Sequence, residues 1–127
     1  MGLAITCIGL LGLLVIGLGL RVSMIRGSTN RAIGCNDDPT DPLYKCIRAH
    51  ANACEYAPML AILIFALASE GYGWWTSCLF IATVVLRYAH AAGMILSPTL
   101  EKGHPLRFAG ALGTYIVGFA LVIDAIF

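Results

Sequence analysis

Charged residues are scarce in this chain of 127 residues. Lys, Arg, Asp and Glu together make up 12% of it and hydrophobic residues 59%, whereas soluble domains carry about 25% charged residues. Residues 3–20 contain no charge at all, and a helix of roughly 20 apolar residues is long enough to cross a bilayer. The composition therefore excludes an ordinary soluble domain and indicates a membrane protein.

The chain also lacks any basic residue before Arg21. A secretory signal peptide would need a basic start and a small-residue cleavage site, so we expect the first segment to stay as a membrane anchor. Three more apolar segments follow, and a single domain over residues 1–127 can use all four. The predicted fold is an all-α, integral membrane four-helix bundle with helices at about 3–26, 43–69, 73–96 and 105–126.

Paired cysteines at metal-binding spacing are missing. The five cysteines are an odd number, none forms a CxxC pair, and their scatter matches no zinc site. We expect no metal and no nucleic-acid partner.

Positive charge is absent from one side of the predicted bundle. All eight Lys and Arg residues lie in or beside the first and third connections, and the second connection has none. The positive-inside rule then places the first and third loops in the cytoplasm and both termini on the non-cytoplasmic side. Trp74 and Trp75 mark the opposite interface. The expected location is a multi-pass position in the inner membrane of a bacterium or the endoplasmic reticulum of a eukaryote.

The second predicted helix carries a polar cluster that runs into an apolar segment. Its members Arg48, Asn52, Glu55 and Tyr56 are spaced i, i+4, i+7 and i+8, so they share one helix face. An Arg or Asp at bilayer depth costs at least ~2.5 kcal/mol, so this face must meet protein or a wet cleft. The mixture of donors, amide and acceptor suits a zwitterionic ligand with carboxylates and an ammonium. Alternatively, Arg48 and Glu55 form a structural pair.

Polar residues also enter the third and fourth predicted helices at their cytoplasmic ends. Arg87, Tyr88 and His90 belong to the third helix, and Arg107 opens the fourth. All these clusters therefore lie near one depth. In the alternative interpretation, the arginines extend to lipid head groups and have no further role. Before the second helix, Asp41 and Pro42 suit the N-cap and first position.

Three motifs in this order resemble the MAPEG family, the membrane-associated proteins of eicosanoid and glutathione metabolism. The first motif is specific, whereas the other two are weak alone. The motifs are Arg48-Ala-His50-x-Asn52-x-x-Glu55-Tyr56-x-Pro58, Arg87-x-x-His90-x-x-Gly93 and Arg107-x-x-Gly110-x-x-x-Thr114. The resemblance runs from the first span to Thr114 and is closest to members of the microsomal glutathione transferase type.

The resemblance implies a homotrimer that binds glutathione, as co-substrate, at the cytosolic side between helices of adjacent subunits. By position, Arg107 matches the arginine that holds the glutathione thiolate. The basic position after the first helix matches Arg26 or, less well, Arg21. The other positions matching glutathione contacts or neighbouring polar positions are Arg48, His50, Asn52, Glu55, Tyr56, Arg87, Tyr88 and His90.

Two departures from the family limit what the resemblance implies. Met94 stands where eicosanoid-forming members have a tyrosine, and the connection 97–105 is longer than in some members. The resemblance therefore implies a general glutathione transferase or peroxidase and not prostaglandin or leukotriene synthesis. Two alternatives stay open: a non-catalytic lipid-binding scaffold of the same family, and an unrelated transporter or channel subunit.

The expected chemistry needs no protein nucleophile. A thiol such as that of glutathione titrates near ~8.5, and lowering this by ~2 units requires about 2.7 kcal/mol. One guanidinium at ~4 Å supplies roughly 4 kcal/mol at an effective dielectric of 20, so Arg107 alone suffices. The thiolate would attack a lipophilic electrophile or a lipid hydroperoxide that arrives from the bilayer. Ser23, Tyr44, Tyr72 and Tyr115 are interpreted as interfacial or packing residues.

Overall fold

Four long helices and no strands make up the protein in a computed structural model that describes residues 1–127. Each helix is long and apolar enough to cross a membrane. The predicted all-α, four-helix membrane fold is therefore confirmed, and the chain is an integral, multi-pass membrane protein. The helices are α1 (Gly2–Thr29), α2 (Pro42–Glu70), α3 (Trp74–Leu96) and α4 (Pro105–Ile126).

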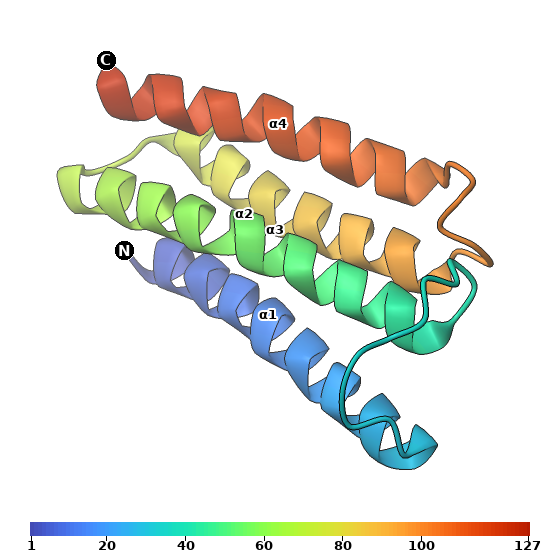
Figure 1. Cartoon of the computed structure of the whole chain (residues 1–127). Helices are drawn as coiled ribbons and strands as arrows, with labels where there is room; N and C mark the ends of the chain where they lie inside the picture. The colour runs from blue at the N-terminus through green and yellow to red at the C-terminus, as the bar shows by residue number, and fades with distance from the viewer.

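The helices run up and down, so both termini lie at one end of the bundle and the two longer loops at the other (Figure 1). We call the second end the loop end. Helix α1 packs mainly on α2, and α4 packs mainly on α3. Helices α2 and α4 touch only sparsely. The charge pattern predicts that the loop end faces the cytoplasm.

Helix α2 begins as its sequence predicts. The carboxylate of Asp41 accepts the backbone N–H of Leu43 at 3.1 Å, and Pro42 occupies the first turn. Asp41 also accepts two hydrogen bonds from Arg31, at 2.5 and 3.1 Å. The hydrogen bond from Arg31 holds the pKa of Asp41 below its ordinary value, so the carboxylate stays ionised and fixes the first long loop to the start of α2.

Helix α1 continues to Thr29, three residues beyond the expected end at residue 26. The hydroxyl of Thr29 donates to the carbonyl of Ile25 at 2.6 Å, so polar side chains can extend the helix after its apolar pattern ends. Asn30 then stops it with a left-handed φ of 54°, and its N–H bonds to the carbonyl of Arg26. Such a left-handed residue is a common C-terminal cap.

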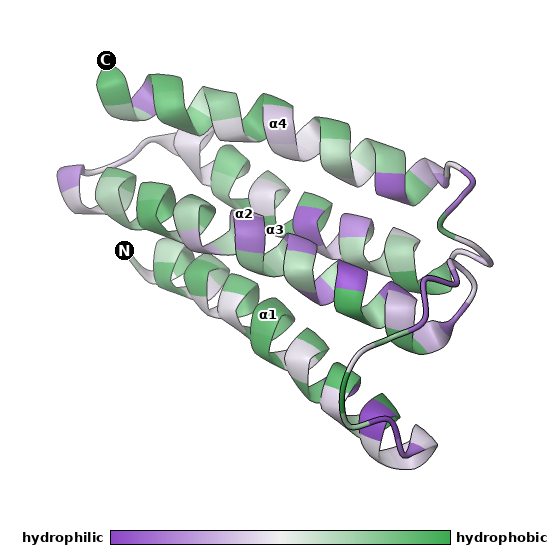
Figure 2. Cartoon of the chain, viewed as in Figure 1, coloured by the Kyte–Doolittle hydropathy of each residue, from purple (hydrophilic) through white to green (hydrophobic).

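The core is apolar, and so is much of the outside. Residues such as Leu11, Ile64 and Phe80 are buried among the helices, while Ile16 and Phe119 are largely exposed on α1 and α4. Exposed apolar side chains of this kind suit contact with lipid tails. Figure 2 shows the hydrophilic positions of α2 and α3 gathered in the halves nearest the loop end. The polar residues that could form a site are therefore concentrated there.

Candidate functional site

Two glycines bring α3 and α4 into backbone contact at the loop end. A Cβ on Gly110 would lie 2.6 Å from the backbone nitrogen of His90, and one on Gly93 would meet the backbone of Arg107. Only glycine leaves room for this approach. As a result, the ring Nδ1 of His90 reaches the carbonyl oxygen of Arg107 at 2.9 Å. The motif glycines thus place the histidine of α3 beside the arginine of α4.

The guanidinium of Arg107 binds the connection between α3 and α4. It donates to the carbonyl oxygens of Leu100 and Lys102, both at 3.1 Å. A guanidinium has five N–H donors, so donors remain for a ligand. Arg107 is half-buried and lines an adjacent hollow. It therefore both holds the loop in place and presents positive charge to this hollow.

This hollow, which we call the polar hollow, lies between α2, α3, α4 and the loop that joins α3 to α4. Its volume is about 480 Å³, within the range of small-molecule sites, ~300–1,000 Å³. Two arginines and two histidines line it, and no carboxylate does, so it favours an anionic ligand. Its lining comprises Tyr44, Arg48, Asn52, His90, Met94, Leu100, Gly103, His104, Arg107, Phe108 and Ala111.

Arg87 is buried directly behind the polar hollow, with 1% of its surface exposed. It donates to the side-chain oxygen of Asn52 at 2.5 Å and approaches the hydroxyl of Thr114 at 3.5 Å. Its guanidinium carbon lies 5.1 Å from the ring centre of Tyr56, a cation–π arrangement. No carboxylate pairs with it, and its Nε has no hydrogen-bond partner. The alternative that Arg87 extends to lipid head groups is therefore wrong.

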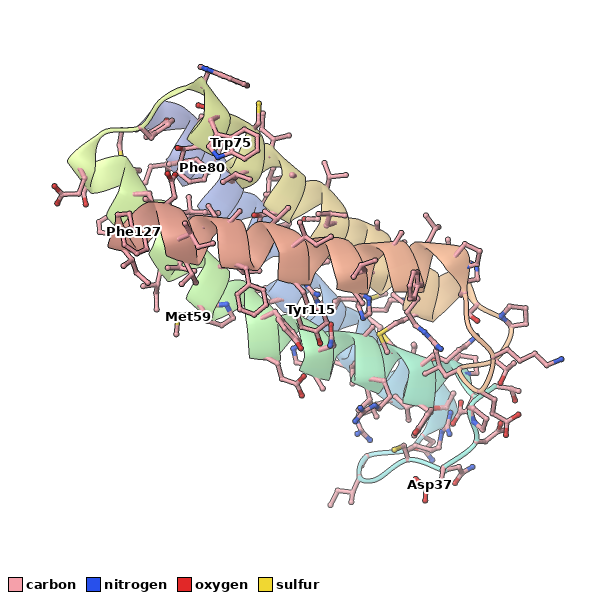
Figure 3. All side chains as sticks on the ribbon, turned by 90° about the horizontal axis from the view of Figure 1, so that it is seen from above. Asp37, Met59, Trp75, Phe80, Tyr115 and Phe127 are labelled. Carbon is pink, nitrogen blue, oxygen red and sulfur yellow. The ribbon has the colours of Figure 1, made fainter.

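A second hollow, which we call the apolar groove, lies between α2 and α4 further toward the middle of the bundle. Its volume is about 280 Å³. The hydroxyls of Tyr56 and Tyr115 meet at 2.8 Å at its polar end, and Figure 3 shows Tyr115 extending from α4 on the side of α2. Glu55 and mostly apolar residues form the rest, namely Met59, Leu60, Leu63, Thr114, Gly118, Phe119 and Val122.

The structure brings most of the predicted site residues together between α2, α3 and α4. Arg48, Asn52, His90 and Arg107 line the polar hollow. Arg87 and Tyr56 lie behind it, around a small cavity that Asn52 and His90 also line. Tyr56 and Glu55 then line the apolar groove. The face predicted for the second helix is therefore a real surface that borders both hollows and the small cavity between them.

Three predicted residues lie elsewhere, on the side of α1. Arg26 donates to loop carbonyls, at 3.1 Å to that of Arg31 and 2.9 Å to that of Gly34. His50 faces α1, where a Cβ on Gly19 would lie 3.2 Å from its Nε2. Tyr88 donates its hydroxyl to the carbonyl of Leu10 in α1 at 2.9 Å. Within one chain, these side chains line neither the polar hollow nor the apolar groove.

Sequence reasoning missed three polar residues at these hollows: Tyr44, which lines the polar hollow, and also Tyr115 and His104. Tyr115 was interpreted as a packing residue, yet it pairs with Tyr56. Its position, eight residues after Arg107, puts both on one face of α4, so helical spacing could have found it. His104 lines the polar hollow as the N-terminal cap of α4, and its Nδ1 is buried without a partner. No motif in the sequence indicates that position.

Comparison with known proteins identifies the family of the chain. The family model described as MAPEG family matches residues 4–127, nearly the whole chain. No curated protein matches the chain. Because the matched region contains all four helices and both hollows, the chain belongs to the MAPEG family.

Proposed function

We propose that the protein is a glutathione transferase, with glutathione peroxidase activity, that acts on lipophilic substrates in the membrane. One observation carries this proposal: a cationic hollow free of carboxylates and an apolar groove follow one another along α2 and α4, and the small cavity beside Arg87 shares lining residues with both. A charged co-substrate in the polar hollow and a lipid-soluble substrate in the apolar groove would then meet between the two hollows.

The polar hollow suits glutathione in charge. Glutathione carries two carboxylates and one ammonium, and Arg48 and Arg107 supply cations for the carboxylates or the thiolate. Glu55, at the neighbouring groove, is exposed and free of any hydrogen bond or ion pair within the chain. It is therefore available as a partner for the ammonium.

In the proposed reaction, Arg107 stabilises the thiolate of glutathione in the polar hollow. This thiolate attacks the electrophilic carbon of a substrate in the apolar groove, and the leaving group departs with its electron pair. With a hydroperoxide, the thiolate instead takes the terminal oxygen and an alcohol leaves. A second glutathione then displaces water to form glutathione disulfide.

We further propose that subunits associate as a homotrimer and share each glutathione site. Arg26, His50 and Tyr88 lie toward α1, whereas the other predicted contacts on α2, α3 and α4 surround the two hollows and the small cavity between them. Within a single chain these two groups of residues lie apart. They would come together if the α1 side of one subunit packed beside the hollows of another subunit. We expect mass measurement in mild detergent to give three chains per particle. A particle containing one chain only would contradict this.

The direct test of the function is calorimetric titration of the purified protein with glutathione. We expect Glu55→Gln to weaken binding by roughly tenfold, because a hydrogen bond to a charged group contributes about 1.5–3 kcal/mol. Asn52→Ala should weaken it at least as much, because Asn52 also holds the guanidinium of Arg87.

Ser77→Ala is the matched control, since Ser77 lies near the opposite end of α3 and bonds only to the carbonyl of Gly73. Its affinity for glutathione should equal that of the wild type. A wild type that binds lipid but no glutathione would instead support the non-catalytic, lipid-binding scaffold.

A further inference from the structure

The hydrogen bond between the ring of His90 on α3 and the backbone of Arg107 on α4 fixes which ring nitrogen of His90 carries the proton. A carbonyl oxygen can only accept a hydrogen bond, so Nδ1 of His90 donates to Arg107 at 2.9 Å. In a neutral imidazole the other nitrogen then has a free lone pair. The close contact at Gly110 holds the histidine backbone at this point. Nε2 is therefore a fixed proton acceptor.

This acceptor opens toward the candidate site. Only 7% of the surface of His90 is exposed. Its Nε2 nevertheless has no hydrogen-bond partner, and it is not one of the buried polar atoms that lack contact with solvent. His90 lines both the polar hollow and the small cavity beside Arg87. A neutral nitrogen with a lone pair thus lies in the hollow where Arg107 offers positive charge.

We propose that His90 is the general base that takes the proton from the thiol of glutathione. The S–H bond breaks, its electron pair stays on sulfur, and the proton binds Nε2. Arg107 stabilises the thiolate, but a guanidinium cannot accept a proton. This assignment rests on the function proposed above. It gives the two residues separate tasks: His90 sets how fast the thiolate forms, and Arg107 sets how much of it is present.

The surroundings favour release of the proton from His90 to solvent water, which returns the ring to its neutral form. Arg87 on α3 and Arg107 on α4 both oppose a lasting positive charge on the ring. His104 is a poorer candidate, because no hydrogen bond fixes which of its ring nitrogens carries the proton, and because a cation is disfavoured at a helix N-terminus. The other titratable or charged groups lining the two cavities are Tyr44, Arg48 and Tyr56 on α2 and Tyr115 on α4.

Rapid mixing of the protein with glutathione, followed by the ultraviolet absorbance of the thiolate, tests this role. We expect His90→Asn to lower the rate constant of thiolate formation by roughly a hundredfold, the low end for general-base catalysis. The asparagine amide can still donate to the Arg107 carbonyl but has no basic nitrogen. The final absorbance should therefore stay within twofold of the wild type, and added imidazole should restore the rate.

A rate constant in His90→Asn equal to that of the wild type would overturn the proposal. If this variant does not fold, the wild type decides alone: thiolate formation should be slower in deuterium oxide, and no slowing would contradict a proton transfer. A wild type that binds no glutathione, or forms no thiolate, would refute the proposed function itself. The two failures are therefore distinguishable.

Discussion

Arg107→Ala is expected to lower the rate with a generic aryl-halide electrophile at neutral pH by roughly a hundredfold. Losing ~2.7 kcal/mol of thiolate stabilisation raises the thiol pKa by ~2 units and lowers the thiolate fraction by that factor. The affinity for glutathione should fall far less, because stabilising the thiolate acts on reactivity more than on binding. Steady-state rates and calorimetric affinities measured on the same preparation check both parts.

Raising the pH separates this effect from structural damage. Arg107 also holds the carbonyls of Leu100 and Lys102, so its loss loosens the loop between α3 and α4. Two further pH units should restore much of the rate in Arg107→Ala, since the unassisted thiol then ionises. The same change should restore little in Asn52→Ala. A rate that stays low at high pH, in a variant that still binds glutathione as the wild type does, would move the thiolate role to Arg87, the buried cation behind the hollow.

Gly110→Ala is expected to destabilise the fold by about 2 kcal/mol or more, in the range of overpacked cores. The added Cβ would lie 2.6–2.7 Å from the backbone nitrogen and the Cα and Cβ of His90. These atoms cannot rotate away as the end of a flexible side chain can, so α3 and α4 must move apart. Thermal unfolding in detergent should show a lower midpoint, or the variant should fail to accumulate.

Gly118→Ala, two turns further along α4, is the matched control. Its Cβ would lie 3.8 Å from Leu60, an ordinary contact. Alanine favours a helix over glycine by roughly 1 kcal/mol, so this variant should be as stable as the wild type or slightly more stable. Equal midpoints for the two variants would show that the contact at Gly110 is not as close as described.

The sequence by itself determined the architecture of this protein. A charge-free run such as residues 3–20 crosses a bilayer only as a helix, because its backbone must satisfy its own hydrogen bonds there. Asp41 and Pro42 marked the start of α2 through local capping, which needs no tertiary contact. Helical spacing likewise put Arg48, Asn52 and Glu55 on one face. These features follow from interactions within one helix or between a helix and the membrane.

Only the tertiary structure decided what each face meets. Periodicity shows that residues share a face but does not show which neighbouring helix covers it. The fold therefore revealed that Arg87 is enclosed, that Tyr115 pairs with Tyr56, and that His50 faces α1. Each outcome is a contact between different helices, such as that of α3 with α4 at Gly110, where the absence of a side chain lets the two backbones meet.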